Sequence, residues 1–152
     1  MHILEVLNLL SAGLLAGAEF VVRFGVRSSI GALDPEPSIL LRQALIRRLR
    51  RVVPALYLPT LLTGLAVTIR YGGGTGLAVR CAAMAAVLVW TVTTFAGTVP
   101  INATILDEWR ADAPPAGWRA TVRRWERLDT IRTVAAMVAF VLFLIAADLR
   151  LP

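Results

Sequence analysis

The sequence has only one cysteine, Cys81, one histidine, His2, and no lysine. A single cysteine excludes a disulfide bond within the chain and a cysteine-based metal cluster. A single histidine excludes the histidine-rich sites that hold haem, copper or two iron ions within one chain. We therefore expect no bound metal ion and no resident cofactor.

All sixteen basic residues are arginines, which give a formal net charge of +6 and an isoelectric point near 11.2. Such a charge is also found in proteins that bind nucleic acids. These arginines, however, fall in two blocks beside apolar runs, as the positive-inside rule predicts for membrane proteins. We therefore expect a lipid bilayer with anionic headgroups as the partner of the arginine-rich face, and no nucleic acid.

Apolar residues dominate the chain, which is 57% hydrophobic with a mean hydropathy of +0.70. A membrane-spanning helix needs about 20 apolar residues. The sequence predicts an all-α integral membrane four-helix bundle, with one transmembrane domain over residues 1–152. The expected spans are residues 3–22, 52–69, 81–103 and 130–148. The first span lacks the basic start and the cleavage site of a signal peptide, so we expect it to be retained.

Two helical stretches are expected to extend beyond the spans. From Ile39 to Arg51, leucines and arginines alternate at helical spacing. This basic amphipathic stretch is expected to lie at the headgroup layer before the second span. Residues 118–149 predict one long final helix that enters the membrane near Thr130 and extends into the cytoplasm.

The distribution of arginines predicts the orientation of the chain. Residues 23–51, the expected first loop, contain seven arginines, and residues 107–132 contain six. Only Arg70 and Arg80 flank the glycine-rich connection Gly72–Gly76. Because loops rich in arginine stay in the cytoplasm, we expect a multi-pass protein of the cell (inner) membrane with both termini outside the cytoplasm.

Unusual polar residues gather toward the arginine-rich end. Glu19 lies near that end of the first span, and Asn102 lies near that end of the third. Trp125, Asp129 and Arg132 share one helix face, with spacings of i, i+4 and i+7. An ionisable side chain in a span costs about 2.5–3.5 kcal/mol at mid-helix, so it needs a partner or a role. We predict Glu19, Asp129, Arg132 and Asn102 as catalytic residues.

Other polar residues at this end are predicted to bind a substrate. Thr94 and Thr98 precede Asn102 on one face of the third helix. Together with Trp125 and Arg23 they form the predicted substrate-binding set. Each threonine hydroxyl has a structural alternative, which is a hydrogen bond to its own helix backbone.

The ionisable residues also have structural alternatives. Glu19 and Arg23 are spaced i, i+4, so they form a possible ion pair at the end of the first helix. Asp129 and Arg132 are spaced i, i+3 and form a second possible pair. The functional interpretation therefore depends on the convergence of these residues at one end.

Three segments together resemble a known family. They are AGAEF at residues 16–20, VPINATIL at residues 99–106 with Trp109 after it, and WERLDTIR at residues 125–132. Their order and spacing are similar to those of the small four-helix membrane proteins that include the anthrone oxygenases of polyketide pathways. The resemblance extends over nearly the whole chain.

This resemblance implies oxidation of a fused-ring phenolic anthrone, a hydrophobic small molecule, to an anthraquinone with molecular oxygen and without an obvious metal or flavin site. It places Glu19, Asn102, Trp125 and Arg132 at the family's marked positions. Asp129 stands where many relatives have histidine or asparagine, so Glu19 and Asp129 are the candidate proton acceptors. Arg132 or Asn102 would then stabilise the developing oxyanion.

Two other functions stay open from the sequence. A carboxylate in the first of four short helices is also a feature of small proton-coupled multidrug transporters, and Glu19 would then carry the proton. A non-catalytic membrane partner or assembly protein would use the small-residue face of Gly13 and Gly17 for close helix packing. The same face permits a homo-oligomer.

Overall fold

The computed structural model describes residues 3–74 and 76–149, and over these ranges its regular secondary structure is all helix, joined by short turns and one loop. The elements are α1 (Ile3–Phe20), a π-helical segment (Val21–Val26), α2 (Arg27–Gly31), α3 (Pro35–Arg70), α4 (Leu77–Val92), a second π-helical segment (Thr93–Thr98), α5 (Val99–Asp107) and α6 (Trp118–Asp148). His2 and one residue of the glycine-rich connection, Thr75, lie outside the described residues.

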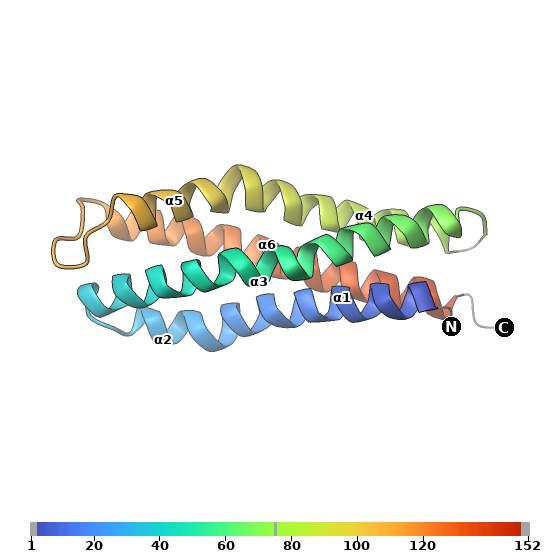
Figure 1. The fold of residues 1–152 in the computed structure, drawn as a ribbon, viewed down its shortest axis with the longest axis horizontal. Coiled ribbons are helices and arrows are strands. Elements are labelled where there is room, and N and C mark those ends of the chain that lie inside the picture. The colour runs from blue at the N-terminus through green and yellow to red at the C-terminus, as the bar shows by residue number, and fades with distance from the viewer. Residues whose placement is uncertain (1–2, 75, 150–152) are drawn as a thin grey trace.

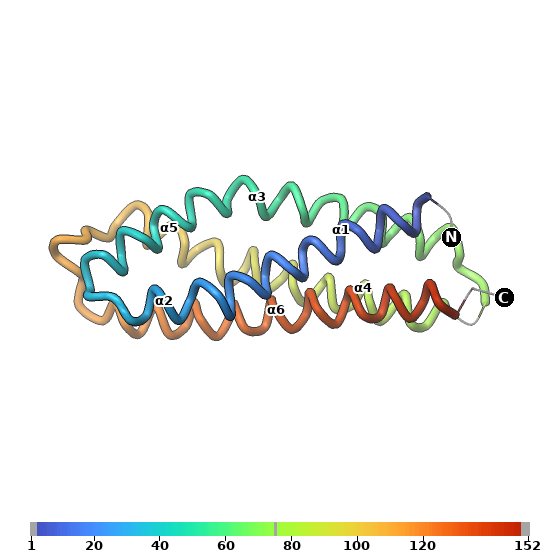
Figure 2. The backbone as a smooth tube through the Cα atoms, turned by 90° about the horizontal axis from the view of Figure 1, so that it is seen from below, coloured from blue at the N-terminus to red at the C-terminus, as the bar shows by residue number. Residues whose placement is uncertain are grey.

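These elements join into four long helices. Over the described residues they are Ile3–Gly31, Pro35–Arg70, Leu77–Asp107 and Trp118–Asp148, each long and apolar enough to cross a membrane. Neighbouring helices along the chain run antiparallel (Figure 1). The start of α1, the α3–α4 connection and the end of α6 lie at one end of the bundle (Figure 2). The predicted all-α four-helix membrane bundle is confirmed.

The surface of the bundle is apolar along most of its length. Leu14, Leu62, Leu88 and Leu144 are each about half exposed or more, although they belong to helices that pack in the bundle. A soluble monomer rarely leaves such a continuous apolar surface in contact with water. This surface is suited to contact with lipid acyl chains, which place no penalty on exposed leucine side chains.

The prediction of one loop over residues 23–51 was wrong. The first helix continues to Gly31, and α3 begins at Pro35 after a short turn. Proline favours the first position of a helix, because its fixed φ suits the helix and its missing N–H group needs no partner there. Pro35 therefore starts α3 at a point where the chain was expected to remain irregular.

The basic amphipathic stretch is helical, as predicted, but it is the first part of α3 and runs alongside the other helices (Figure 1). It packs against the end of the third long helix. The Nε2 group of Gln43 donates hydrogen bonds to the backbone oxygens of Ile105 and Trp109, at 2.9 and 3.1 Å. Ile39 and Ile46 are buried in the same cluster. The stretch is therefore part of the bundle.

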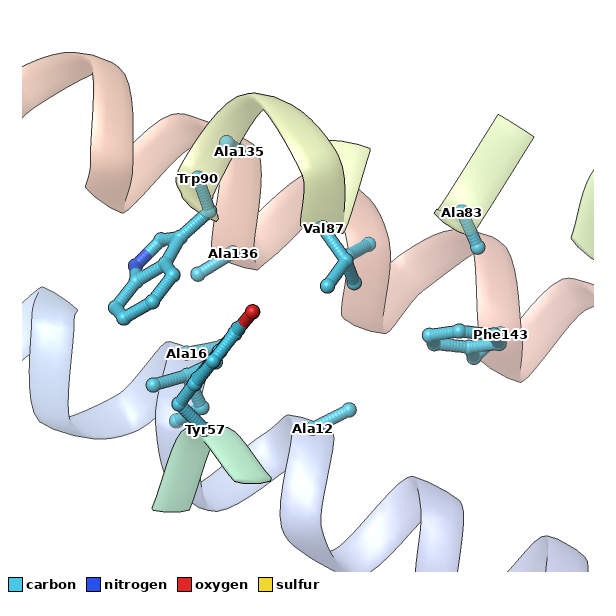
Figure 3. Close-up of a cluster of buried hydrophobic side chains, with 11 residues drawn as sticks. Ala12, Ala16, Tyr57, Ala83, Val87, Trp90, Ala135, Ala136 and Phe143 are labelled. Carbon is cyan, nitrogen blue, oxygen red and sulfur yellow. The ribbon is translucent and has the colours of Figure 1, made fainter. Parts of the chain in front are cut away.

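Small residues allow α1, α4 and α6 to pack closely. Ala12 and Ala16 of α1, Ala136 of α6 and the side chains of Tyr57 and Trp90 belong to one buried cluster, in which the Tyr57 ring has a central place (Figure 3). Such small-residue interfaces are how helix backbones approach each other in lipid. The aromatic pair supports one wall of the site described next.

The glycines of the small-residue face in α1 have different surroundings. A Cβ atom at Gly13 would lie 3.2 Å from the Phe140 ring, whereas one at Gly17 would meet nothing within 4 Å. Gly13 therefore serves packing within the bundle, and Gly17 faces open space.

Candidate functional site

A cavity of about 420 Å³ lies inside the bundle. Residues of all four long helices line it, and it falls in the size range of about 300–1,000 Å³ that is typical of small-molecule sites. Seven of the eight predicted site residues line this cavity: Glu19, Thr94, Thr98, Asn102, Trp125, Asp129 and Arg132. The structure therefore brings together residues that are far apart in the sequence.

Glu19 accepts two hydrogen bonds at the inner end of the cavity, and its side chain is almost fully buried. Its Oε1 atom accepts one from the indole Nε1 of Trp90 at 3.0 Å and another from the Nη2 group of Arg132. The guanidinium of Arg132 also lies over the Trp90 ring, 5.0 Å from its centroid. The suggested pairing of Glu19 with Arg23 is not formed, because Arg132 takes that place.

The carboxylate of Asp129 differs from that of Glu19 in its hydrogen-bond and ion-pair partners. Asp129 is 1% exposed, and over the described residues its Oδ2 atom has no hydrogen-bond partner. Arg132 forms its ion pair with Glu19 and not with Asp129. A buried carboxylate oxygen without a partner is costly. Because Asp129 lines the cavity, its carboxyl group is a candidate contact for a ligand.

A second polar pair supports the side of the cavity toward the α5–α6 loop. The indole Nε1 of Trp125 donates a hydrogen bond to Oδ1 of Asn102 at 2.9 Å. This bond orients the amide, so that the Nδ2 group of Asn102 is left as the donor for a ligand. The guanidinium of Arg42 lies over the Trp125 ring, 5.2 Å from its centroid.

The threonines of the third helix have a structural role as well as a place in the cavity wall. The hydroxyl of Thr94 donates to the Trp90 oxygen at 2.8 Å, and that of Thr98 donates to the Thr93 oxygen at 3.4 Å. Both side chains therefore bond their own helix backbone, as the structural alternative expected, and both also line the cavity.

Most of the remaining cavity wall is apolar. Leu15, Val22, Val53, Leu58 and Phe95 contribute from three of the four long helices. A flat apolar molecule would therefore contact hydrocarbon over most of its surface and meet the polar groups at one side.

The cavity opens sideways, between α3 and the third long helix. Leu58 on one side and Phe95 and Val99 on the other all line the cavity, yet they are 51%, 58% and 45% exposed. Contacts between α3 and α5 are few. The opening therefore faces the region that lipid acyl chains occupy.

Arg23 is the predicted site residue that does not line the cavity. It is half-buried, and its guanidinium lies over the ring of Phe24 at 5.4 Å. The π-helical segment Val21–Val26 begins between Glu19 and Arg23. A π-helical turn shifts the register of the residues after it, so the i, i+4 spacing no longer places Arg23 beside Glu19.

Sequence reasoning missed two aromatic residues of the site, Trp90 and Tyr57. They stack with ring centroids 4.8 Å apart, and the Tyr57 hydroxyl lies 3.0 Å from that of Thr91. Both stand in apolar runs, where an aromatic residue is more often packing than function. A tryptophan in the middle of a span, away from the interface where tryptophans usually lie, was the signal that could have found Trp90.

The described residues include no group of three or more His, Cys, Asp and Glu side chains placed to hold a metal ion. The polar residues that line the cavity instead carry two carboxylates (Glu19 and Asp129), two guanidinium groups (Arg50 and Arg132), one amide (Asn102) and the hydroxyls of Tyr57 and two threonines.

The fold and this cavity define a four-helix membrane protein with a mainly apolar site large enough for a small molecule. The chain belongs to the anthrone oxygenase family, whose profile matches residues 43–142. The match contains Asn102, Trp125, Asp129 and Arg132, and it begins after Glu19. Comparisons with curated proteins and with solved structures find no match.

Proposed function

We propose that this chain is a membrane-embedded oxygenase that needs no resident cofactor and oxidises a hydrophobic, anthrone-like phenol. One observation carries the proposal most directly. In the part of the chain that the structure describes, Oδ2 of the buried Asp129 has no hydrogen-bond partner, and the residue lines a largely apolar cavity beside Arg132. Membership of the anthrone oxygenase family supports the oxygenase class.

The substrate class follows from the walls of the cavity. A planar fused-ring compound suits the apolar side chains, and its phenol and ketone oxygens suit the polar side where Arg132 and Asn102 lie. Molecular oxygen is apolar and also partitions into such surroundings. The sideways opening at Leu58 and Val99 supports a substrate that arrives from the bilayer.

Proton removal is the first step of the proposed reaction. The methylene group between the aromatic rings of an anthrone is a carbon acid, because the negative charge of its carbanion is delocalised through the rings onto the ketone oxygen. Asp129 accepts this proton as the general base. Arg132 and the Nδ2 group of Asn102 stabilise the negative charge that develops on the substrate oxygen. Glu19 holds the guanidinium of Arg132 in position through their ion pair.

Oxygen then reacts with the anion directly. One electron passes from the carbanion to O2, and the resulting carbon radical and superoxide combine into a carbon-bound peroxide anion. This anion takes back the proton that Asp129 accepted and becomes a hydroperoxide. The second hydrogen then leaves that carbon as a proton while the O–O bond breaks and releases hydroxide, which gives a ketone and one water. The substrate is oxidised by four electrons and O2 is reduced by four, so that anthrone and O2 become anthraquinone and water.

The proposal is tested with the purified protein in lipid nanodiscs and a hydroxylated anthrone as the probe. We expect protein-dependent oxygen consumption, with equal amounts of quinone formed and O2 consumed. Empty nanodiscs give the spontaneous background. Consumption at the background rate over a panel of hydroxylated anthrones would contradict the proposal.

Narrowing the sideways opening is expected to slow the use of a large substrate. Leu58→Trp places a bulky ring at the opening, and we expect kcat/KM for a three-ring anthrone to fall by about tenfold or more. Leu62→Trp is the matched control, because Leu62 lies one turn further along α3, is 63% exposed and does not line the cavity. Equal activity of the two variants would show that substrate does not pass between α3 and the third helix.

The structure weakens the support for the transporter alternative and for the assembly alternative. The transporter alternative depended on Glu19, whose carboxylate already accepts hydrogen bonds from Arg132 and Trp90. The assembly alternative depended on Gly13 and Gly17, and the Phe140 ring of the same bundle fills the space beside Gly13. The assembly alternative does not account for the cavity.

We further propose that the protein lies in the cell (inner) membrane with both termini outside the cytoplasm. The proposal rests on the distribution of the arginines. Most of them lie toward the α2–α3 turn and the α5–α6 loop, at the end of the bundle opposite the termini. A reporter inserted after Gly73 is expected to be accessible from outside the cytoplasm. Protection of that reporter in intact cells, with exposure only after lysis, would reverse the orientation.

A further inference from the structure

A second cavity, of about 250 Å³, lies near the end of the bundle that contains the α2–α3 turn and the α5–α6 loop. Residues of α3 and α6 form most of its wall. Pro35 and Ser38 contribute from the first turn of α3, and Trp118 and Arg119 contribute from the first turn of α6. This cavity has so far no role in the proposed oxidation.

The charge of this second cavity is positive. Arg42, Arg119 and Arg123 line it, and Glu126 is the one acidic residue in its wall. Glu126 is already engaged, because its Oε2 atom forms an ion pair with Arg27 at 3.1 Å. Three arginines around one cavity attract an anion and repel a cation.

The helix directions add to this positive potential. Both α3 and α6 begin at the cavity, and the N-terminal end of a helix carries a partial positive charge. Over the described residues, the backbone N–H groups at the start of α3 donate no hydrogen bond to the side chain of the capping residue Asp34, and the capping residue of α6, Gly117, has no side chain. Converging helix N-termini beside arginines are a frequent arrangement for binding phosphate and other anions.

An independent observation comes from Arg42. This side chain is 2% exposed, and its Nε and Nη1 groups have no hydrogen-bond partner among the described residues. One side of its guanidinium is covered by the Trp125 ring. A buried guanidinium normally satisfies its donors with an acceptor, and unpartnered ones are costly. The missing acceptor and the positive cavity indicate the same class of ligand.

We propose that the second cavity binds a phosphate group, with Arg42 as the inner donor and Arg123 at the rim. The guanidinium group suits phosphate because its N–H donors can form two parallel hydrogen bonds to the oxygens. A phospholipid headgroup and free phosphate share this chemistry. The site lies at the end of a membrane bundle, where both a lipid headgroup and dissolved phosphate can reach it, so an experiment must distinguish the two sources.

The test compares two probes with the whole chain in maltoside detergent micelles, which contain no phosphate. The first probe is inorganic phosphate at constant ionic strength, with chloride as the balancing anion. The second is phosphatidylglycerol added to the micelles, with bound lipid counted by native mass spectrometry. Phosphate that raises the melting temperature points to a soluble ligand. Retention of phosphatidylglycerol without an effect of phosphate points to a lipid headgroup.

The control is a pair of neighbouring arginines on α6. Arg123 lines the cavity, whereas Arg124 is exposed and does not line it, so Arg123→Gln and Arg124→Gln remove the same charge from different places. We expect roughly tenfold weaker binding of the effective probe in Arg123→Gln and none of this loss in Arg124→Gln. Arg42→Gln should weaken binding further.

Two outcomes would overturn the proposal. Equal loss in Arg123→Gln and Arg124→Gln would mean that general charge attraction, and no built site, retains the anion. Absence of binding by the wild type to either probe would overturn it as well. If Arg42→Gln does not fold, the comparison of Arg123 with Arg124 decides alone. No oxidation is measured, so the result does not depend on the proposed oxygenase activity.

Discussion

Replacing Asp129 by asparagine is expected to lower kcat for anthrone oxidation by about 10²- to 10⁴-fold. The substitution preserves the size of the side chain but removes the group that accepts the proton from carbon. Asp129 is 1% exposed and its Oδ2 atom has no partner over the described residues, so loss of its charge should not destabilise the bundle. Oxygen consumption at saturating substrate measures the effect, and thermal unfolding checks the fold.

Asp148→Asn provides the control for this prediction. Asp148 is exposed at the opposite end of the same helix, so its replacement makes the same chemical change away from the cavity. Activity should stay at the wild-type level. If the Asp129→Asn protein were folded and retained more than about a tenth of wild-type kcat, the general base would have to be a different group.

Replacing Glu19 by glutamine is expected to destabilise the protein by about 3–5 kcal/mol. The change leaves the charge of Arg132 buried without its partner, while the amide oxygen can still accept the hydrogen bond from Trp90. In the double variant Glu19→Gln/Arg132→Gln no unpaired charge remains, so part of the lost stability should return. Denaturant-induced unfolding in detergent, followed by tryptophan fluorescence, gives the free energies of unfolding of the wild type, of the single variants Glu19→Gln and Arg132→Gln and of the double variant, and hence the coupling between the two residues.

The partly exposed ion pair between Arg27 and Glu126 is the matched comparison. Its side chains are 20% and 21% exposed, and breaking it with Arg27→Gln should cost no more than about 1 kcal/mol. A Glu19→Gln protein as stable as Arg27→Gln would mean that Arg132 reaches solvent or a different acceptor. That result would remove the proposed positioning role of Glu19.

The number and kind of helices could be predicted from the sequence because hydropathy acts over whole segments. Helix α6 was expected at residues 118–149 and is found at Trp118–Asp148. The ends near prolines were harder, since the same residue breaks one helix and begins another. Pro35 illustrates this, because it begins α3 inside the expected loop.

The candidate site was predictable where its residues share one regular helix. Trp125, Asp129 and Arg132 line the cavity together because α6 keeps the i, i+4 and i+7 spacing. Contacts between helices were not predictable in this way. The partner of Glu19 is Arg132, 113 residues away, and only the packing of α1 against α6 brings the two together.

An irregular stretch of backbone explains why Arg23 does not line the cavity with the other predicted site residues. The π-helical segment after Phe20 separates Arg23 from the cavity, and no residue type in that segment marks it in advance. A second such segment, Thr93–Thr98, lies between Trp90 and Asn102. Both adjoin the cavity, in keeping with the frequent occurrence of π-helical turns at functional sites.

The central claim, that Asp129 removes a proton from carbon in this cavity, is tested most directly without oxygen. Under anaerobic conditions in deuterated buffer, proton NMR follows the loss of the methylene signal of a hydroxylated anthrone, at a pH where the free compound exchanges slowly. The account predicts exchange by the wild type at least about 10² times faster than by Asp129→Asn or in empty nanodiscs. Exchange no faster with the wild type than in empty nanodiscs would contradict it.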